Sequence, residues 1–297
     1  MKFITEATIT DQVIDAMQGT PDTRLREVCA SLVKHLHAFV REIKPSVKEF
    51  EHGCEFMVAL GQSSSAKKNE VILALDILGV SALVTLLNDA QNETLHDHDK
   101  TDAALLGPFW RSASPSYPSG GNIARGQDAD SPEQVMLVSG VVRDPQGHPV
   151  ADALVDVWQA SPRGLYENQD DTQPDMNLRG RFTTDADGYY CFRTVRPAGY
   201  PVPVDGPCGD LLRAQHRDPY RPAHIHFMAS KPGHQVLVTQ AFSDDDPRLA
   251  TDVAFSVMES LVGHIDTTPV VGSHHFSLNF DMVLHPGETL FPIPPLG

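Results

Sequence analysis

Residues 221–230 read RPAHIHFMAS, an apolar run that carries two histidines two positions apart. Side chains of a β-strand alternate between its two faces, so His224 and His226 point the same way if this run is a strand. Two imidazoles on one face can form part of a metal site, because histidine is the commonest metal ligand. They can equally be half-buried residues of an ordinary sheet. The pair alone leaves both interpretations open.

The segments around this run share its strand character. From residue 134 onward, short apolar segments alternate with turn residues, which predicts strands over 134–144, 153–160, 181–195, 235–242 and 275–284. Asp187–Gly188 is a hairpin signal inside the third of them. Several short strands with few helices between them predict a mainly β fold, an antiparallel β-sandwich.

The first hundred residues have the helical period instead. Apolar residues three and four positions apart predict an amphipathic helix over 22–43 and a second helix over 46–62, which begins at a Ser46–Glu49 capping box. A third helix over 68–89 is apolar nearly all round, so we expect it to be deeply packed. We therefore predict an N-terminal helical domain over 1–107 and a β-sandwich domain over 108–297.

The composition restricts the classes of partner that the protein can bind. The chain has 297 residues, of which 41% are hydrophobic, and a net charge of -16, which repels nucleic acid and anionic membranes. We find neither a run of roughly 18 apolar residues nor the pattern of a secretory signal. Four scattered cysteines favour free thiols in a reducing compartment. We expect a cytoplasmic protein with no nucleic-acid or membrane partner.

Two tyrosines lie in loops that can converge on the histidine strand. Tyr200 lies in the Pro- and Gly-rich segment 196–222, and loops of this length are usually functional. Tyr166 follows the predicted strand 153–160. Two phenolates with two imidazoles suit Fe(III), whereas zinc favours cysteine and histidine. Taken alone, each tyrosine is better explained as a buried ring with a bonded hydroxyl group.

Three segments together resemble the intradiol ring-cleaving dioxygenases: GLYENQ (164–169), GYPVPVDGP (199–207) and RPAHIHF (221–227). The resemblance runs through the whole chain. It implies an iron-binding β-sandwich that uses O2 to open an aromatic ortho-diol between its two hydroxylated carbons. It also implies one non-haem Fe(III) per subunit, held by a solvent ligand and by Tyr166, Tyr200, His224 and His226.

The resemblance assigns catalytic roles as well. It implies that Tyr200 is the ligand that leaves when the diol chelates the iron. Arg221 matches an arginine beside the bound ring, where it would stabilise developing negative charge. Gln240 matches a position near the iron.

The identity of the diol rests on fewer residues. Leu73 and Asp76 lie three positions apart on one helix face, and an aspartate among apolar residues is costly to bury unless it bonds a polar group. The third hydroxyl of hydroxyquinol (benzene-1,2,4-triol) is a candidate partner, although a capping or solvent-facing carboxylate explains Asp76 equally well. The remaining pocket candidates are Leu106, Gly107, Pro108, Phe109, Cys208 and Phe255.

Sequence likeness favours hydroxyquinol, which would be cleaved to 3-hydroxy-cis,cis-muconate or maleylacetate. Gln240 stands where we expect histidine in many hydroxyquinol enzymes, so catechol or a chlorocatechol, giving cis,cis-muconates, remains the alternative. Two hypotheses from other classes are a metal-free binding sandwich and a hydrolase with zinc on the histidine pair. The binding sandwich does not explain four potential ligands around one long loop, and zinc content with activity in the absence of O2 would favour the hydrolase.

The resemblance also implies a homodimer formed through the N-terminal helices, with phospholipid at its interface. The apolar stripe from Leu25 to Ile43 fits that arrangement and fits packing inside one chain equally well. We expect no metal site at His96 and His98, which lie in a charged loop. The adjacent His274 and His275 would face opposite ways in a strand and could not chelate together.

Overall fold

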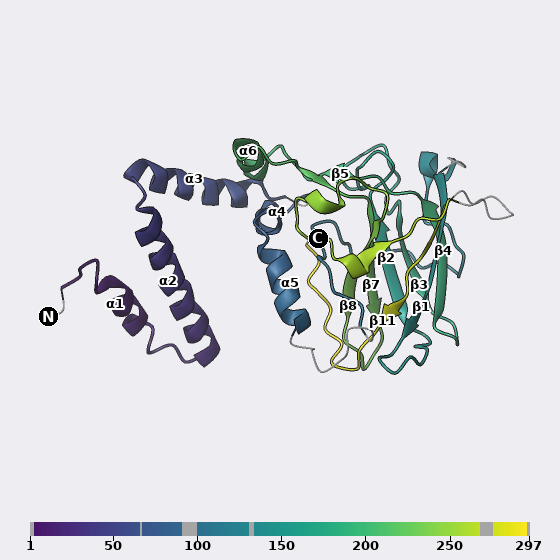
Figure 1. Cartoon of the computed structure of the whole chain (residues 1–297), viewed down its shortest axis with the longest axis horizontal. Coiled ribbons are helices and arrows are strands. Elements are labelled where there is room, and N and C mark those ends of the chain that lie inside the picture. Colours follow the sequence, from purple (N-terminus) through teal and green to yellow (C-terminus); the bar gives the residue numbers. More distant parts are fainter. Residues whose placement is uncertain (1–2, 66, 91–99, 131–133, 268–275, 296–297) are drawn as a thin grey trace. The chain divides into compact units, whose positions relative to one another are not determined.

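The structure is a computed structural model that describes residues 3–65, 67–90, 100–130, 134–267 and 276–295. The expectations for His96, His98, His274 and His275 fall outside these described residues. Contacts divide the chain into two compact units, Met1–Val58 and Ala59–Gly297. The second unit contains helices as well as both sheets (Figure 1). The predicted functional boundary at 107/108 stays a prediction.

The first unit consists of helices α1 (Ile9–Ala16), α2 (Thr23–Ile43) and the beginning of α3 (Val47–Ser63). The Asp22 carboxylate accepts the N–H groups of Arg24 and Leu25, which caps α2. The predicted capping box of α3 is confirmed, because the Ser46 N–H donates to Glu49 Oε2 at 2.8 Å and the Glu49 N–H donates to Ser46 Oγ at 3.3 Å. Local sequence therefore sets these helix ends.

The prediction of one helix over 68–89 is wrong. The segment forms α4 (Glu70–Ile77) and α5 (Val80–Ala90), and the break falls at Gly79, whose φ is +72°. Glycine adopts this left-handed conformation without steric cost, so the chain turns there. Only part of the segment is deeply packed: Leu73 and Ile77 of α4 are buried, whereas Leu83 of α5 is 56% exposed.

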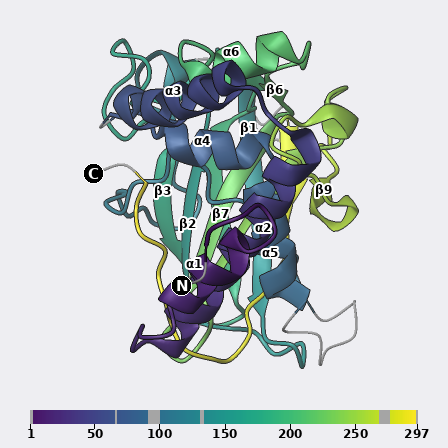
Figure 2. The ribbon, with the colours of Figure 1, turned by 90° about the vertical axis from the view of Figure 1, so that its left-hand side faces the viewer.

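No single helix of the described residues is long and apolar enough to cross a membrane. The segments Glu70–Ile77 and Val80–Asp89 reach that length only together, and they are bent by 73° at their break. Within the second unit, α4 packs beside α6 (Pro207–Ala214). Both helices are labelled in Figure 2.

The predicted β-sandwich is confirmed, with sheets of mixed rather than purely antiparallel pairing. One sheet contains β1 (Val135–Arg143), β4 (Tyr189–Val195), β10 (Phe276–Asn279) and β11 (Met282–Val283). The other has the order β3 (Arg179–Thr183), β2 (Leu154–Gln159), β7 (His224–Ser230), β8 (Leu237–Ser243), β9 (Val262–Gly263). Strands β10 and β11 pair parallel to β1, and β9 pairs parallel to β8. Strands β9 and β10 follow long connections rather than tight hairpins, so nothing local imposes the antiparallel direction. Two residues separate β11 from β10, and β11 keeps the direction of β10.

A small ladder joins β5 (Tyr200–Pro201) to β6 (Tyr220–Arg221), and three 3-10 helices complete the described elements: η1 (Gly126–Asp130), η3 (Leu249–Thr251) and η4 (Glu259–Leu261). The ladder places Tyr200 directly opposite Arg221, although 20 residues lie between them along the chain. Two candidate residues of one loop are therefore neighbours.

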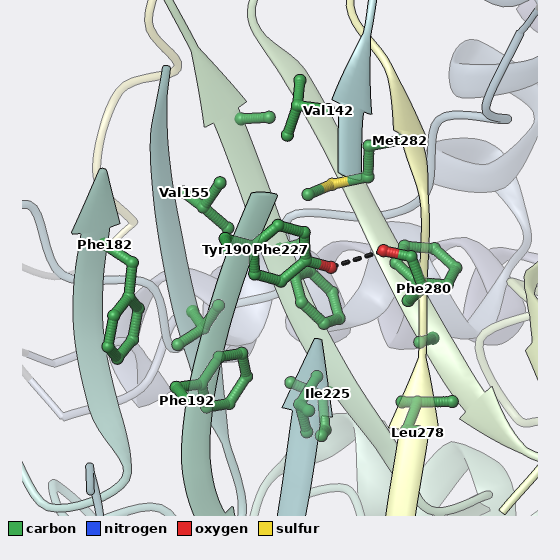
Figure 3. Close-up of a cluster of buried hydrophobic side chains, with 14 of the residues drawn as sticks. Val142, Val155, Phe182, Tyr190, Phe192, Ile225, Phe227, Leu278, Phe280 and Met282 are labelled. Atoms are coloured by element: carbon green, nitrogen blue, oxygen red, sulfur yellow. Dashed lines mark hydrogen bonds between the residues drawn. The ribbon is translucent and has the colours of Figure 1, made fainter. Parts of the chain in front are cut away.

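The hydrophobic core lies between the two sheets (Figure 3). Ile225 and Phe227 of β7 enter it from one sheet, and Tyr190 and Phe192 of β4 enter it from the other. The Tyr190 hydroxyl donates to the Phe280 carbonyl at 2.5 Å, so this buried phenol has its acceptor. Because residues 225 and 227 face the core, the strand alternation sends His224 and His226 to the opposite face of the sheet.

Candidate active site

The two histidines of β7 come together on one buried face. Both side chains are buried, and their Nε2 atoms lie 3.2 Å apart. His224 Nδ1 lies 2.7 Å from the Pro222 carbonyl oxygen. A neutral imidazole in this position carries its proton on Nδ1 and leaves a lone pair on Nε2, which is the tautomer a metal ligand needs.

The two tyrosines reach the histidine pair from separate loops. The hydroxyl oxygens of Tyr166 and Tyr200 lie 3.3 Å apart and are buried. The ring centroids of Tyr200 and His224 lie 5.5 Å apart, and those of Tyr166 and His226 lie 6.5 Å apart. Gly164 allows this approach, because a Cβ at its φ of +77° would lie 3.1 Å from Tyr200 Cβ.

Burial controls the ionisation of all four groups. It raises the pKa of Tyr166 well above its usual value and raises the pKa of Tyr200. It lowers the pKa of His224 to about 3, with a further contribution from Arg221, and lowers the pKa of His226 well below its usual value. A cation at their centre would reverse the preference of the phenols and stabilise them as phenolates.

This donor set fits a hard metal ion. Two phenol oxygens and two imidazole nitrogens converge in a buried space, and such ligands suit a trivalent ion. Among the described residues, no group of three histidine, cysteine, aspartate or glutamate side chains could hold a metal. The two tyrosines are oxygen donors that lie beside the histidine pair.

Arg221 connects the histidines to a polar network. Its guanidinium is buried; Nη1 lies 3.2 Å from His224 Nε2, and Nη2 donates to Gln240 Oε1 at 2.9 Å. Gln240 Nε2 in turn donates to the Leu105 carbonyl, and Gln240 stands opposite His226 across the β7–β8 ladder. Arg221 Nε also donates to Asp252 Oδ1 at 3.0 Å. Burial opposes the charge on Asp252, but Arg221 prevails and lowers the pKa of Asp252.

Asp76 is a buried carboxyl group close to this network. It is 5% exposed, so the solvent-facing explanation of Asp76 does not hold. Asn69 caps α4, whereas Asp76 bonds Ser81 in the first turn of α5, so the capping explanation stays open. Burial raises the pKa of Asp76 to about 6, and the hydrogen bond with Ser81 and then the charge of Arg221 partly oppose this shift. Leu73 is buried on the same helix.

The other candidate pocket residues divide into two groups. Phe109 stacks on Tyr166 with ring centroids 4.5 Å apart, Leu106 packs on the same cluster, and a Cβ on Gly107 would lie 3.4 Å from His226 Cε1. Pro108 lies between them and is half-buried. Cys208 and Phe255 contact residues of other segments. Their place in the pocket stays a prediction.

The Cys208 N–H donates to the buried Glu70 carboxylate at 3.1 Å. Phe255 is 57% exposed, and its ring lies 5.1 Å from the Arg217 guanidinium. Both residues therefore bridge the loops to α4 and its neighbourhood rather than to the tyrosines or histidines.

Sequence reasoning missed two residues. Trp158 stacks on His226 with ring centroids 4.7 Å apart and an interplanar angle of 7°, because the two residues are directly opposed across the β2–β7 ladder. The strand that ends in WQA just before Tyr166 was a usable signal for it. Asp252 had no such signal, since it lies 31 positions from Arg221 in an irregular segment.

Comparisons with known proteins identify the family. The family model described as "Dioxygenase" matches residues 107–286, and "Catechol dioxygenase N terminus" matches residues 22–96. The chain belongs to the intradiol ring-cleaving dioxygenases. A hydroxyquinol 1,2-dioxygenase of Rhizobium sp. is 41% identical over 88% of this chain and 85% of the relative. A catechol 1,2-dioxygenase of Candida albicans is 36% identical over 93% of this chain and 91% of the relative.

A solved structure agrees with this assignment. The hydroxyquinol 1,2-dioxygenase of Pseudomonas putida DLL-E4 superimposes with a TM-score of 0.84 at 36% identity, covering 95% of this chain and 99% of that one. As an intradiol dioxygenase, the protein uses O2 to open an aromatic ortho-diol between its hydroxylated carbons. The family predicted from three motifs is confirmed, and the hypotheses of a binding module and of a zinc hydrolase are wrong.

The raised pKa of Asp76 predicts a pH-dependent stability of this dioxygenase. When a carboxyl group has a higher pKa in the folded than in the unfolded state, the free energy of unfolding falls as the pH rises through the folded pKa. A shift from 3.8 to about 6 corresponds to about 3 kcal/mol. We expect Asp76→Asn to increase the free energy of unfolding relative to the wild type at pH 8, and to lose this advantage near pH 4.

Urea unfolding at the two pH values measures the effect. Asp171→Asn is the matched control, because the Asp171 side chain is 90% exposed and its removal should change stability little at either pH. An equal effect of Asp76→Asn at pH 4 and pH 8 would contradict the raised pKa.

Proposed function

We propose that this intradiol dioxygenase is a hydroxyquinol 1,2-dioxygenase, which forms 3-hydroxy-cis,cis-muconate or its tautomer maleylacetate. The observation that carries the proposal is the buried Asp76 carboxyl group, which lies among apolar residues of α4, bonds Ser81 and is within electrostatic reach of Arg221. Hydroxyquinol has a third hydroxyl that such a group can bind, and catechol does not. The names of the Rhizobium and Pseudomonas relatives support the same substrate.

Catechol is the second candidate substrate. The Candida albicans relative is a catechol 1,2-dioxygenase, and Gln240 occupies the position where we expected histidine in hydroxyquinol enzymes. Gln240 Nε2 bonds a backbone carbonyl and its Oε1 accepts from Arg221, so both ends of this side chain already have partners. That arrangement favours a supporting role for Gln240 over a choice between diols.

The proposed cofactor is one non-haem Fe(III) per chain, held by Tyr166, Tyr200, His224 and His226. Bound there, it would supply the Lewis-acidic and redox-active centre that diol chelation and O2 chemistry require. The proposal is supported by the convergence of these four donors in a buried space and by the neutral state that burial imposes on both imidazoles.

The chain's own residues would prepare the diol. An ortho-diol must lose two protons to chelate as a dianion. Tyr200, held as a phenolate by the bound cation, would accept one of them, and solvent would accept the other. Arg221 Nη1 lies where it can stabilise negative charge on the ring and its oxygens. Trp158 and Phe109 cover His226 and Tyr166 and exclude water from that side.

We also propose a homodimer formed through the helical unit. Seven apolar residues of α2 are each between 46% and 56% exposed: Leu25, Val28, Leu32, Leu36, Phe39, Val40 and Ile43. An apolar face of this extent usually marks an interface. A hollow of about 650 Å³ between α2 and α3, lined by Phe39, Ile43, Phe50 and Met57 among others, has the size and the apolar lining to take a phospholipid chain.

We also propose a cytoplasmic location. The four free cysteines agree with a reducing compartment.

Oxygen consumption with separate diols tests the substrate. We expect kcat/KM for hydroxyquinol to exceed that for catechol and for chlorocatechols by about tenfold or more. Asp76→Asn should lower the hydroxyquinol value about tenfold and leave the catechol value within about twofold. Asp171→Asn serves again as the exposed control. Preference for catechol by a wide margin, or an equal loss with both diols, would refute the assignment of Asp76.

Visible absorption tests the metal centre. The purified protein should contain iron and be wine-red from tyrosinate-to-iron charge transfer, and Tyr200→Phe should shift that band and slow turnover by about tenfold or more. Tyr189→Phe is the control, because Tyr189 lies on β4 and is 38% exposed. A fully metallated but colourless protein would end the proposal, and an unchanged Tyr200→Phe band would remove Tyr200 from the ligand set.

Sedimentation equilibrium tests the dimer. We expect a species of twice the 32.5 kDa chain mass, which Leu32→Glu dissociates by placing a charge in the apolar face. Lys34→Glu adds a carboxylate two positions away on the exposed surface of the same helix and should leave the dimer intact. A monomeric wild type at micromolar concentration would contradict the proposal.

A further inference from the structure

Asp252 holds the guanidinium of Arg221 at two points. Arg221 Nε donates to Asp252 Oδ1 at 3.0 Å and Nη2 donates to Oδ2 at 3.2 Å, and the two residues are 4% and 6% exposed. A two-point contact fixes the plane of the guanidinium as well as its position. The remaining nitrogen, Nη1, is thereby directed at His224 Nε2, 3.2 Å away.

The same carboxylate shapes the loop that follows it. Asp252 Oδ1 accepts the Ala254 N–H at 3.2 Å, and Oδ2 accepts the Ser256 N–H at 3.0 Å. Between these contacts, Phe255 adopts a φ of +55°, which is uncommon for a residue with a side chain. The Asp252 side chain therefore holds a strained loop, residues 252–256, in one conformation.

This loop meets the helices that carry Asp76. Arg217 donates to the Ile77 carbonyl at 2.7 Å and to the Val253 carbonyl at 3.1 Å, which ties the loop to the end of α4. The Phe255 ring lies against Gly79, where a Cβ would be 3.5 Å from it. One buried carboxylate thus joins the arginine of the candidate site to the loop that packs on the α4–α5 turn.

We propose that Asp252 is a positioning residue for ring cleavage, which directs Arg221 Nη1 at the bound diol while holding loop 252–256 against the α4–α5 turn. The proposal rests on the proposed metal and diol site. Stabilising charge as it develops on a ring requires a donor that is already oriented before the reaction. A long, flexible arginine side chain lacks that orientation unless its partners supply it.

Two variants of Asp252 test the proposal against a purely structural ion pair. Asp252→Asn replaces one acceptor oxygen by an N–H donor, which opposes the donors of Arg221 and Ser256. Asp252→Glu keeps the charge, so that Arg221 stays paired, but displaces the carboxylate by one methylene. Asp156→Asn is the control, because Asp156 is likewise a buried carboxylate, 3% exposed, but it pairs with Arg181 at 2.9 Å instead of Arg221 and lies opposite Met228.

Four quantities are measured on the iron-loaded proteins: iron content, thermal midpoint, kcat, and the visible band of the anaerobic hydroxyquinol complex, in which no turnover occurs. We expect both Asp252 variants to retain iron, to lose kcat by about tenfold or more, and to shift the visible band of the diol complex. Asp156→Asn should leave kcat within about twofold and the band unchanged.

The outcomes separate this inference from the proposed function. A kcat within twofold of the wild type and an unshifted band in Asp252→Glu would overturn the inference, whether or not Asp252→Asn folds. The same losses in Asp156→Asn would overturn it as well, because they would report general destabilisation. A wild type that consumes O2 with none of the diols would instead overturn the proposed function, and the inference with it.

Discussion

The alternation of β7 between two environments is the constraint on which the site depends. Ile225 and Phe227 fill the core between the sheets, so His224 and His226 must lie on the other face. A register shift of one residue would bury both imidazoles in the apolar core and remove the site. Pairing with β2 on one side and β8 on the other prevents that shift, and it also brings Trp158 and Gln240 to the flanks of His226.

Burial then sets the chemistry of the groups that this register collects. It keeps both imidazoles neutral, with His224 presenting a lone pair on Nε2, and it makes both phenols reluctant to ionise without a nearby positive charge. The cluster is therefore suited to a cation, since low polarity strengthens every charge interaction inside it. Arg221 is accommodated in the same space because Asp252 balances its charge and Gln240 accepts one of its hydrogen bonds.

The walls of the site are less independent than their positions in the sequence suggest. Arg221 is opposite Tyr200 in the β5–β6 ladder, bonded to Asp252 and Gln240, and through Gln240 it reaches the backbone of the segment that carries Phe109. Asp76 differs from Asp252, because the charge of Arg221 only partly offsets the effect of burial on Asp76. The pKa of Asp76 is raised, so its charged form lowers the stability of the fold. Groups of this kind concentrate at functional sites, where binding outweighs the cost of burial.

The sequence by itself determined the local and periodic features: the two capped helices, the strand of the histidine pair, and the motifs that identify the family. These depend on residues a few positions apart, where spacing dictates geometry. Only the tertiary structure decided the break of the third helix at Gly79, the parallel pairing of β9, β10 and β11, and the role of Asp252 beside Arg221. The break at Gly79 is a local turn, which the continuous apolar pattern of the segment concealed. The strand pairing and the Asp252 contact depend on segments that meet only after long connections close, and no local period records which distant residues will be neighbours.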